Sequence, residues 1–202
     1  MKVIAIDAGP AHSVVSRSVE YAARAAEVAG ATVSRIRLSS LEVYSCTGCR
    51  MCSFTGSCKI DDDLVRLAER IAEADGVIVG IPAYFRKAEP AVRALLDRLS
   101  SYFSDDGQLR LPGFSETEIP SSHVARAAKR AIVITATTAP EPIATFFGYT
   151  TGPIRELRSA LSDGGIRLVG SLAVAGTWSR PALDEWERDK ATSLGHLIAG
   201  RV

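Results

Sequence analysis

Short apolar runs alternate with longer amphipathic segments along most of the chain. The short runs are rich in β-branched residues and are bounded by Gly, Pro or Asp, which favours buried strands. The longer segments repeat their apolar residues at the spacing that one face of a helix requires. The predicted strands are 2–7, 32–38, 76–81, 131–137 and 167–175, and the predicted helices are 14–29, 64–74, 89–101, 153–163 and 181–199.

This alternation predicts a parallel sheet covered by helices on both faces, because consecutive parallel strands need a crossover connection. For 202 residues, we expect an α/β flavodoxin-like doubly wound sheet of five parallel strands in the order 2-1-3-4-5. A Rossmann dinucleotide domain is the nearest alternative, but residues 8–13 read Ala-Gly-Pro-Ala-His-Ser and lack the spacing G-x-G-x-x-G. We expect a single domain over 1–202, with a cysteine-rich loop at 45–60 and a long loop at 103–125.

The composition narrows the possible partners. The net charge is +1, so the chain has no broad electrostatic footprint for nucleic acid. No run approaches the ~20 apolar residues of a membrane span, and the first residues lack the pattern of a signal peptide. We therefore expect a cytoplasmic protein with neither nucleic acid nor membrane as a partner.

All four cysteines of the chain fall in one segment, at Cys46, Cys49, Cys52 and Cys58. In a reducing compartment such a group indicates metal binding or redox chemistry rather than a structural disulfide framework. The C-x2-C-x2-C part resembles a cubane iron–sulfur site, although ferredoxins usually place the fourth ligand differently. Four thiolates also satisfy tetrahedral zinc. An iron–sulfur cluster, zinc, a disulfide and free thiols are the alternatives at this stage.

A second candidate site follows the first strand. Ligands of such sheets bind beyond the carboxyl ends of the strands, near the switch in strand order. Residues 9–16 lead directly into a helix N-terminus, where oriented N–H groups bind phosphate. Ser13 and Ser16 are the hydroxyl candidates, and Arg17 adds positive charge. The alternative is that either serine only caps the helix.

Two further loops belong to the same edge. Residues 82–86 contain Tyr84 and Phe85, whose flat rings suit stacking on a flavin or another planar cofactor. Thr137 and Thr138 follow the fourth strand and supply hydroxyl groups near the same crevice. By contrast, we expect the Asp61–Asp63 run and Arg98 to be solvated helix faces or caps.

Several motifs together resemble the NAD(P)H-dependent FMN reductase superfamily, and within it the iron–sulfur flavoprotein branch. They are Gly9-Pro10 after the first strand, the four-cysteine motif, Ile60-Asp61-Asp62, the run Ala74-Asp75-x-Val77-x-Val79-x-x-Pro82-x-Tyr84, and Leu96-Asp97-Arg98. The resemblance covers residues 1 to about 100. It implies a flavodoxin-like fold, bound FMN, NAD(P)H as co-substrate, a homodimer or homotetramer, and a [4Fe-4S] cluster on the four cysteines.

The resemblance also assigns residues to the flavin. It implies a phosphate loop with Gly9, Pro10 and Ser16, a flavin-ring loop with Pro82, Ala83, Tyr84 and Phe85, and a third loop with Thr137 and Thr138. The first loop departs from the family pattern, because Ala11 stands where relatives have an arginine. A charge-assisted hydrogen bond to phosphate contributes roughly 1.5–3 kcal/mol. Weaker FMN binding, no FMN binding, or compensation by His12 or Arg17 are the expected alternatives.

The implied function is an FMN-dependent oxidoreductase that passes electrons from NAD(P)H through flavin and the cluster to a small-molecule or protein acceptor. The flavin carries the redox chemistry, so no catalytic residue is predicted. One alternative is a simple NAD(P)H:FMN or quinone reductase without a cluster. The other is a non-catalytic redox-sensing or zinc-binding domain on the same fold.

Overall fold

The computed structural model describes residues 1–51, 54, 58–84, 87–88, 90–103, 129–163, 165–180 and 182–200. Of the predicted features, Cys52, Phe85 and nearly all of the long loop at 103–125 lie outside the described residues. Within them, no helix has the length and apolar character needed to cross a bilayer.

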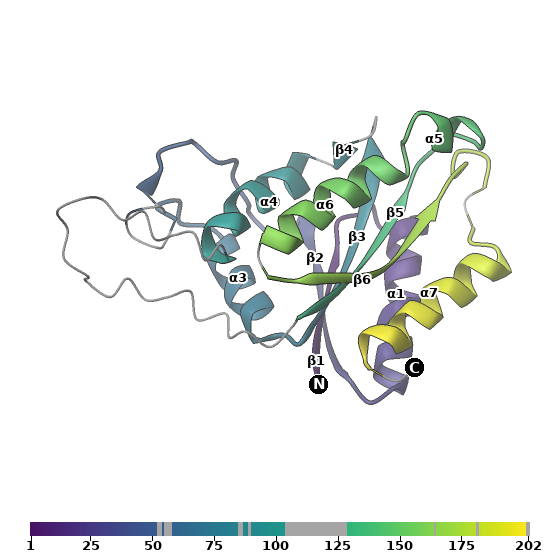
Figure 1. The fold of residues 1–202 in the computed structure, drawn as a ribbon, viewed down its shortest axis with the longest axis horizontal. Coiled ribbons are helices and arrows are strands. Elements are labelled where there is room, and N and C mark those ends of the chain that lie inside the picture. The colour runs from purple at the N-terminus through teal and green to yellow at the C-terminus, as the bar shows by residue number, and fades with distance from the viewer. Residues whose placement is uncertain are drawn as a thin grey trace.

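Five parallel strands form the centre of the molecule (Figure 1). They are β1 (Lys2–Asp7), β2 (Thr32–Arg37), β3 (Gly76–Tyr84), β5 (Arg130–Ala136) and β6 (Arg167–Val174). Their order in the sheet is β2-β1-β3-β5-β6, which is the predicted order 2-1-3-4-5. The flavodoxin-like fold is therefore confirmed.

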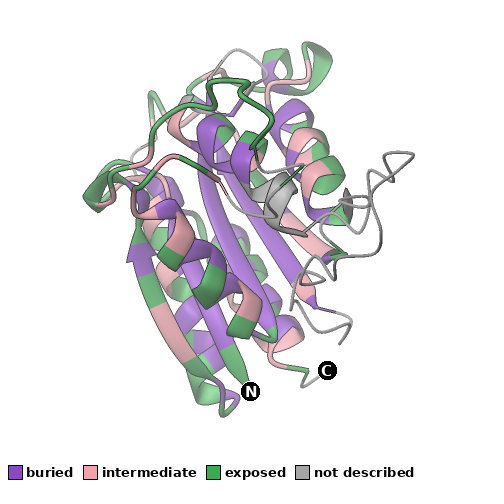
Figure 2. Ribbon diagram, turned by 90° about the vertical axis from the view of Figure 1, so that its left-hand side faces the viewer, coloured by how far each residue is buried: buried purple, intermediate pink, exposed green. Residues whose placement is uncertain are grey.

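Helices cover both faces of this sheet (Figure 1). The helices on one face are α1 (Val14–Val28) and α7 (Glu185–Ile198), and those on the other are α3 (Leu64–Glu73), α4 (Pro90–Phe103) and α6 (Thr151–Asp163). Side chains of β1 alternate between the two cores: Ile4 and Ile6 pack toward α3, whereas Val3 and Ala5 pack toward α1. The central strands β1, β3 and β5 are almost wholly buried between these layers, whereas the edge strands β2 and β6 are partly exposed (Figure 2).

Three short elements were not predicted: η1 (Leu38–Ser40), β4 (Lys87–Ala88) and α5 (Ile143–Phe146). β3 also continues through Pro82 to Tyr84, because its end pairs with β4 in an antiparallel hairpin. The predicted start of the last helix was wrong. α7 begins at Glu185, because Asp184 accepts a hydrogen bond from the Glu187 amide in a capping box.

The contact between α1 and α7 depends on Gly195. A Cβ atom there would lie 2.2 Å from the carbonyl oxygen of Ala22 and 2.7 Å from the Cβ of Ala25. We expect Gly195→Ala to lower the free energy of unfolding by about 1–3 kcal/mol, although alanine is the better helix former. Denaturant titration measures this loss, and Ser193→Ala on the exposed side of α7 is the control. A Gly195→Ala variant as stable as the control would contradict the close packing.

Candidate functional site

The loops that the sequence assigned to a cofactor meet at the carboxyl edge of the sheet (Figure 1). β1, β3 and β5 are neighbours, with Asp7 paired to Gly80 and Pro82 paired to Ala136. The chain segments that follow these three strands therefore start side by side. This is the edge at which doubly wound sheets bind their ligands.

The first of these segments is built around the N-terminus of α1. Ser13 is the N-cap, and its Oγ accepts a hydrogen bond from the Ser16 amide at 3.2 Å. Ser13 does cap the helix, yet its hydroxyl proton remains able to donate to a ligand. Gly9 is needed for this arrangement, because a Cβ atom there would lie 2.8 Å from Ser13 Oγ and 3.2 Å from Asp7 Oδ1.

Asp7 was not among the predicted site residues, although it lies at the centre of this loop. Its Oδ1 accepts the Gly9 amide at 2.9 Å, and its Oδ2 accepts the Ser16 hydroxyl at 2.6 Å. The residue is only 8% exposed. A carboxylate beside a helix N-terminus is stabilised by the helix dipole. It also repels a phosphate that approaches the same N–H groups.

Arg37, at the end of β2, supplies the opposing charge. Its Nη2 lies 3.6 Å from Asp7 Oδ2 and 3.5 Å from Ser16 Oγ. Arg17 is held in place differently, because its Nε and Nη2 both donate to the His12 carbonyl at 3.0 and 2.9 Å. A cleft of about 400 Å³ opens here, and its polar lining includes Asp7, His12, Ser16, Arg17, Arg35 and Arg37. The sequence contained the signal for Arg37, since the strand order places the end of β2 beside the end of β1.

The second segment is the hairpin between β3 and β4. Pro82 and Ala83 are buried, and the Tyr84 backbone pairs with Lys87. Phe85 lies outside the described residues, and only the backbone of Tyr84 is described. The hairpin thus fixes the chain at the position predicted to face a flavin ring.

The third segment follows β5 and is tied to the loop after β6. Thr137 is buried, its Oγ1 accepts the Ala139 amide at 3.3 Å, and its carbonyl accepts the Thr177 amide and hydroxyl, both at 3.1 Å. Thr138 is exposed. Of the two threonines, Thr138 is therefore the one that presents its side chain to solvent at this edge.

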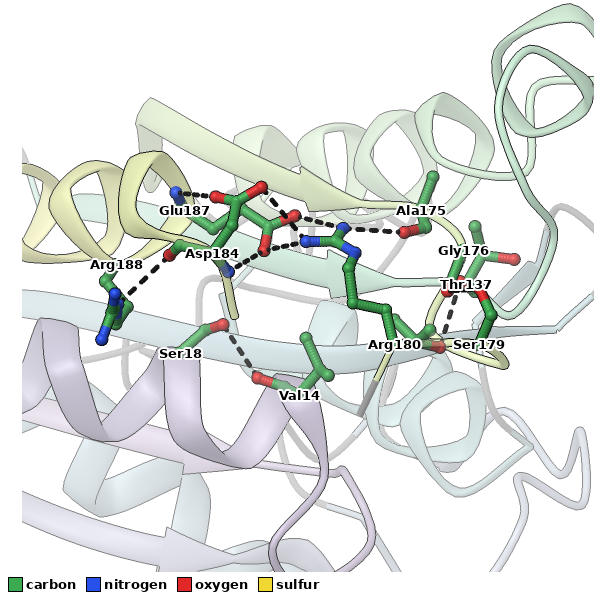
Figure 3. A network of polar contacts seen from close by, with 11 residues as sticks. Val14, Ser18, Thr137, Ala175, Gly176, Ser179, Arg180, Asp184, Glu187 and Arg188 are labelled. Carbon is green, nitrogen blue, oxygen red and sulfur yellow. Dashed lines mark hydrogen bonds and ion pairs between the residues drawn. The ribbon is translucent and has the colours of Figure 1, made fainter. Parts of the chain in front are cut away.

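The loop after β6 is anchored by a separate ion pair (Figure 3). Arg180 binds Glu187 through both terminal nitrogens, at 2.8 and 2.7 Å, and donates to the Ala175 carbonyl at 3.1 Å. Glu187 is 4% exposed and belongs to the first turn of α7. This forked contact fixes residues 175–180 against α7.

Exposed aromatic side chains gather beyond β5. Phe146 and Phe147 make an edge-to-face contact with centroids 5.1 Å apart, and Phe147 also contacts Tyr149. Phe146 is 82% exposed, and Trp178 in the loop after β6 is 86% exposed. The two loops touch, because the Gly176 amide donates to the Ala139 carbonyl at 2.8 Å. Exposed aromatic groups of this kind are typical of surfaces that bind a ligand or another chain.

The cysteine segment lies at the periphery, before α3. Cys46 and Cys49 are exposed and Cys58 is half-buried. Hydrogen bonds from the Met51 backbone and the Thr47 side chain lower the pKa of the Cys49 thiol, which favours the thiolate that binds metals. Among the described residues, which omit Cys52, no three Cys, His, Asp or Glu side chains are placed to hold a metal ion.

The expectation that Arg98 and the Asp61–Asp63 run are solvated was wrong for Arg98 and Asp62. Their side chains are 1% and 0% exposed and form a two-pronged ion pair. Burial opposes the charge on Asp62, but hydrogen bonds from Arg98 and from the Tyr44 and Leu64 amides keep its pKa below the usual range. The spacing of Arg98 from the buried Val92 and Leu95 on α4 could have indicated its burial.

A family model described as NADPH-dependent FMN reductase matches residues 1–133. The chain belongs to the NADPH-dependent FMN reductase family. An iron–sulfur flavoprotein of Methanocaldococcus jannaschii is 35% identical to this family member over 99 residues, 48% of the chain and 51% of the relative. The chain thus spans about half the length of the curated relatives it matches.

Solved structures share the fold of this NADPH-dependent FMN reductase family member at low identity. A flavone reductase superposes with a TM-score of 0.74 at 15% identity, covering 99% of this chain and 62% of the other. A flavodoxin of Megasphaera elsdenii superposes with a TM-score of 0.56 at 12% identity, covering 98% of both chains. These similarities support the flavodoxin-like fold alone.

The residues present are chemically suited to both groups that the family resemblance implies, FMN and a metal cluster. For FMN, the α1 N-terminus, Gly9 and the arginines of the cleft are groups that suit a phosphate, whereas Asp7 and Glu20 oppose it, and Arg35 is already paired with Glu20 and Glu27. For a cluster, soft thiolates are the ligands that iron–sulfur groups and zinc prefer.

Proposed function

We propose that this protein is an FMN-dependent oxidoreductase that takes electrons from NAD(P)H and delivers them, with the help of a [4Fe-4S] cluster on Cys46, Cys49, Cys52 and Cys58, to a small-molecule or protein acceptor. The observation that carries the proposal is the meeting of three strand-end loops beside the α1 N-terminus. Membership of a family of NADPH-dependent FMN reductases supports FMN as the cofactor of that edge. When bound, the flavin supplies hydride acceptance and the cluster supplies one-electron transfer.

In this proposal, residues of the chain bind the FMN phosphate and orient the flavin ring. The backbone at Gly9 and Pro10 and the Ser13 hydroxyl bind the phosphate at the start of α1. Arg37 takes the role of the arginine that the first loop lacks, because its guanidinium lies beside Ser16 and Asp7 at the start of α1. It also offsets the negative charge of Asp7 on that phosphate.

Residues on the other two loops face the flavin ring. The hairpin that starts at Pro82, Ala83 and Tyr84 holds one side of it, with Phe85 as the second aromatic candidate. Thr138 approaches from the loop after β5, and the buried Thr137 positions that loop through its contacts with Ala139 and Thr177. No side chain of this edge is required as a proton donor for hydride transfer, so we assign no catalytic acid or base.

The assembly and location form part of the same proposal. A cysteine group that binds a metal centre rather than forming a disulfide framework suits the reducing cytoplasm. The exposed Phe146, Phe147 and Trp178 suit burial in a homodimer or homotetramer. Light scattering of the purified protein tests the assembly. A monomer at micromolar concentration would contradict it.

The decisive experiment is a visible absorption spectrum of anaerobically purified protein, before and after NADPH, with iron and acid-labile sulfide measured on the same sample. We expect flavin bands over a broad iron–sulfur absorbance, both bleached by NADPH. Flavin bands without iron would favour the runner-up, a simple NAD(P)H:FMN or quinone reductase. Colourless protein with bound zinc would overturn the proposal in favour of a non-catalytic domain.

A further inference from the structure

The two ends of the cysteine segment are joined below the cysteines. Two hydrogen bonds join Glu42 and Asp63: the Asp63 amide donates to the Glu42 carbonyl at 3.1 Å, and the Glu42 amide donates to the side-chain Oδ2 of Asp63 at 3.0 Å. One step further in, the Tyr44 amide donates to Asp62 Oδ2 at 2.9 Å. Residues 42–44 and 62–63 therefore run together as the base of the segment.

Arg98 completes this base from α4. One terminal nitrogen donates to the Tyr44 carbonyl at 3.0 Å, and the other donates to the Ile60 carbonyl at 3.3 Å. Both nitrogens also bind Asp62. A single guanidinium thus holds the chain where it enters the cysteine segment and where it leaves.

The thiols stand close to these fixed points. Cys46 follows Tyr44 by two residues, and Cys58 precedes Ile60 by two, so each is within about 7 Å of chain from an anchored carbonyl. The Cys58 sulfur is itself a hydrogen-bond partner of Arg98. This contact explains why Cys58 is half-buried while Cys46 and Cys49 are exposed.

The chemistry of the Arg98–Asp62 ion pair is better suited to positioning the cysteine segment than to stabilising the fold. Replacing a buried ion pair by apolar side chains of similar volume often leaves a protein equally stable, so burial alone does not account for this pair. Asp62 is fully used as an acceptor by Arg98, the Tyr44 amide and the Leu64 amide. A planar, forked guanidinium can donate to the two carbonyls and the carboxylate at once, which the compact ammonium group of a lysine cannot match.

We propose that Arg98 is a positioning residue that, together with Asp62, closes the base of the cysteine segment and sets Cys46 and Cys58 at the separation a metal centre needs. The inference rests on the proposed metal site of the four cysteines and adds the element that orients it. Arg98 acts through hydrogen bonds to backbone and thiol and is not itself a ligand. Partners of this kind behind the ligands typically change metal affinity 10- to 100-fold when they are replaced.

The test is Zn²⁺ affinity of the reduced, metal-free full-length protein, measured by competition with a chromophoric chelator. We expect Arg98→Lys, which keeps the charge and loses the fork, to weaken Zn²⁺ binding by about 10- to 100-fold. The matched control is Arg180→Lys, which alters an equally forked ion pair on the far side of the sheet. It should lower the melting temperature without changing Zn²⁺ affinity. Unchanged affinity in Arg98→Lys, or an equal loss in Arg180→Lys, would overturn the inference.

Two further measurements test the inference if the first variant is uninformative. If Arg98→Lys does not fold, the double variant Arg98→Met with Asp62→Leu removes both charges, and it should fold and show the same loss of affinity. The second measurement is the Cys46–Cys58 disulfide equilibrium in glutathione buffer, with Cys49 and Cys52 replaced by serine. We expect Arg98→Lys to lower the effective concentration of this thiol pair by about tenfold.

The outcomes separate this inference from the proposed function. If the parent protein binds no Zn²⁺ but the disulfide equilibrium shifts in Arg98→Lys, the metal site fails and the positioning role stands. The parent protein and Arg98→Lys could instead bind Zn²⁺ equally strongly and show the same disulfide equilibrium. That result would contradict the positioning role of Arg98 and support the metal site.

Discussion

Replacing Cys49 with serine is expected to abolish electron delivery to a one-electron acceptor while FMN stays bound. The thiolate is the ligand, and a serine hydroxyl at nearly the same position is a poor one for iron. The proposed flavin site lies on the strand-end loops and shares no residue with the cysteine segment, so the affinity for FMN should not change. Anaerobic reduction of a one-electron acceptor by NADPH measures the loss, and flavin content per chain measures what is kept.

A matched control for this experiment is Ser45→Ala, a change of similar size in the same exposed segment. It should retain both iron and electron transfer. If Cys49→Ser reduces the one-electron acceptor as fast as the parent protein, the cysteines are not on the electron path and the protein acts as a simple flavin reductase.

Opposite changes in FMN affinity are expected from Arg37 and Asp7. Removing the cation in Arg37→Ala should weaken FMN binding by about tenfold, the lower end of the range for a charge-assisted hydrogen bond, because the side chain is partly solvated. Removing the anion in Asp7→Asn should strengthen it by a similar factor. The asparagine oxygen can still accept the Gly9 amide, and its NH2 group can donate to the Ser16 oxygen, which now accepts instead of donating. Fluorescence titration of the apoprotein with FMN measures both.

Riboflavin provides the internal control, because it has the same ring and no phosphate. Neither substitution should change its affinity by more than about twofold. As a control variant, Arg24→Ala removes an exposed arginine from α1 that pairs with Glu20. Parallel losses for FMN and riboflavin in Arg37→Ala would show that Arg37 supports the fold of the loop rather than the phosphate.

The sequence was sufficient for the central strands because they are buried on both faces. Ile4, Ile6 and Val79 belong to one core and Val3 and Ile78 to the other, so near-continuous apolar runs marked β1, β3 and β5. The edge strand β2 carried the alternating pattern of a partly exposed strand instead. Elements of two to four residues, such as β4 and α5, carry no such pattern. They form through tertiary pairing and short-range hydrogen bonds.

The candidate site was predicted in outline and missed in its electrostatics. Strand ends and small residues indicated the loops at Gly9, Pro82 and Thr137. The charged residues that tune them come from elsewhere: Arg37 reaches the first loop from the neighbouring strand, and Arg98 reaches Asp62 across 36 positions of sequence. The spacing of apolar residues shows which face of a helix a charged residue occupies. It does not show whether a residue of opposite charge from another element contacts it, so buried and solvated ion pairs cannot be told apart from the sequence.

The helix α4 connects the two proposed redox regions and sets their spacing. It starts directly after the β3–β4 hairpin, and Arg98 lies eight residues beyond Pro90, a rise of about 12 Å. Val92, Leu95 and Arg98 share the buried stripe of this helix, and one inserted residue would turn the guanidinium by about 100° away from it. The number of residues in α4 thus sets the distance between the proposed flavin edge and the cysteine segment. Single-residue insertions in α4 should therefore be less tolerated than most substitutions on its exposed side.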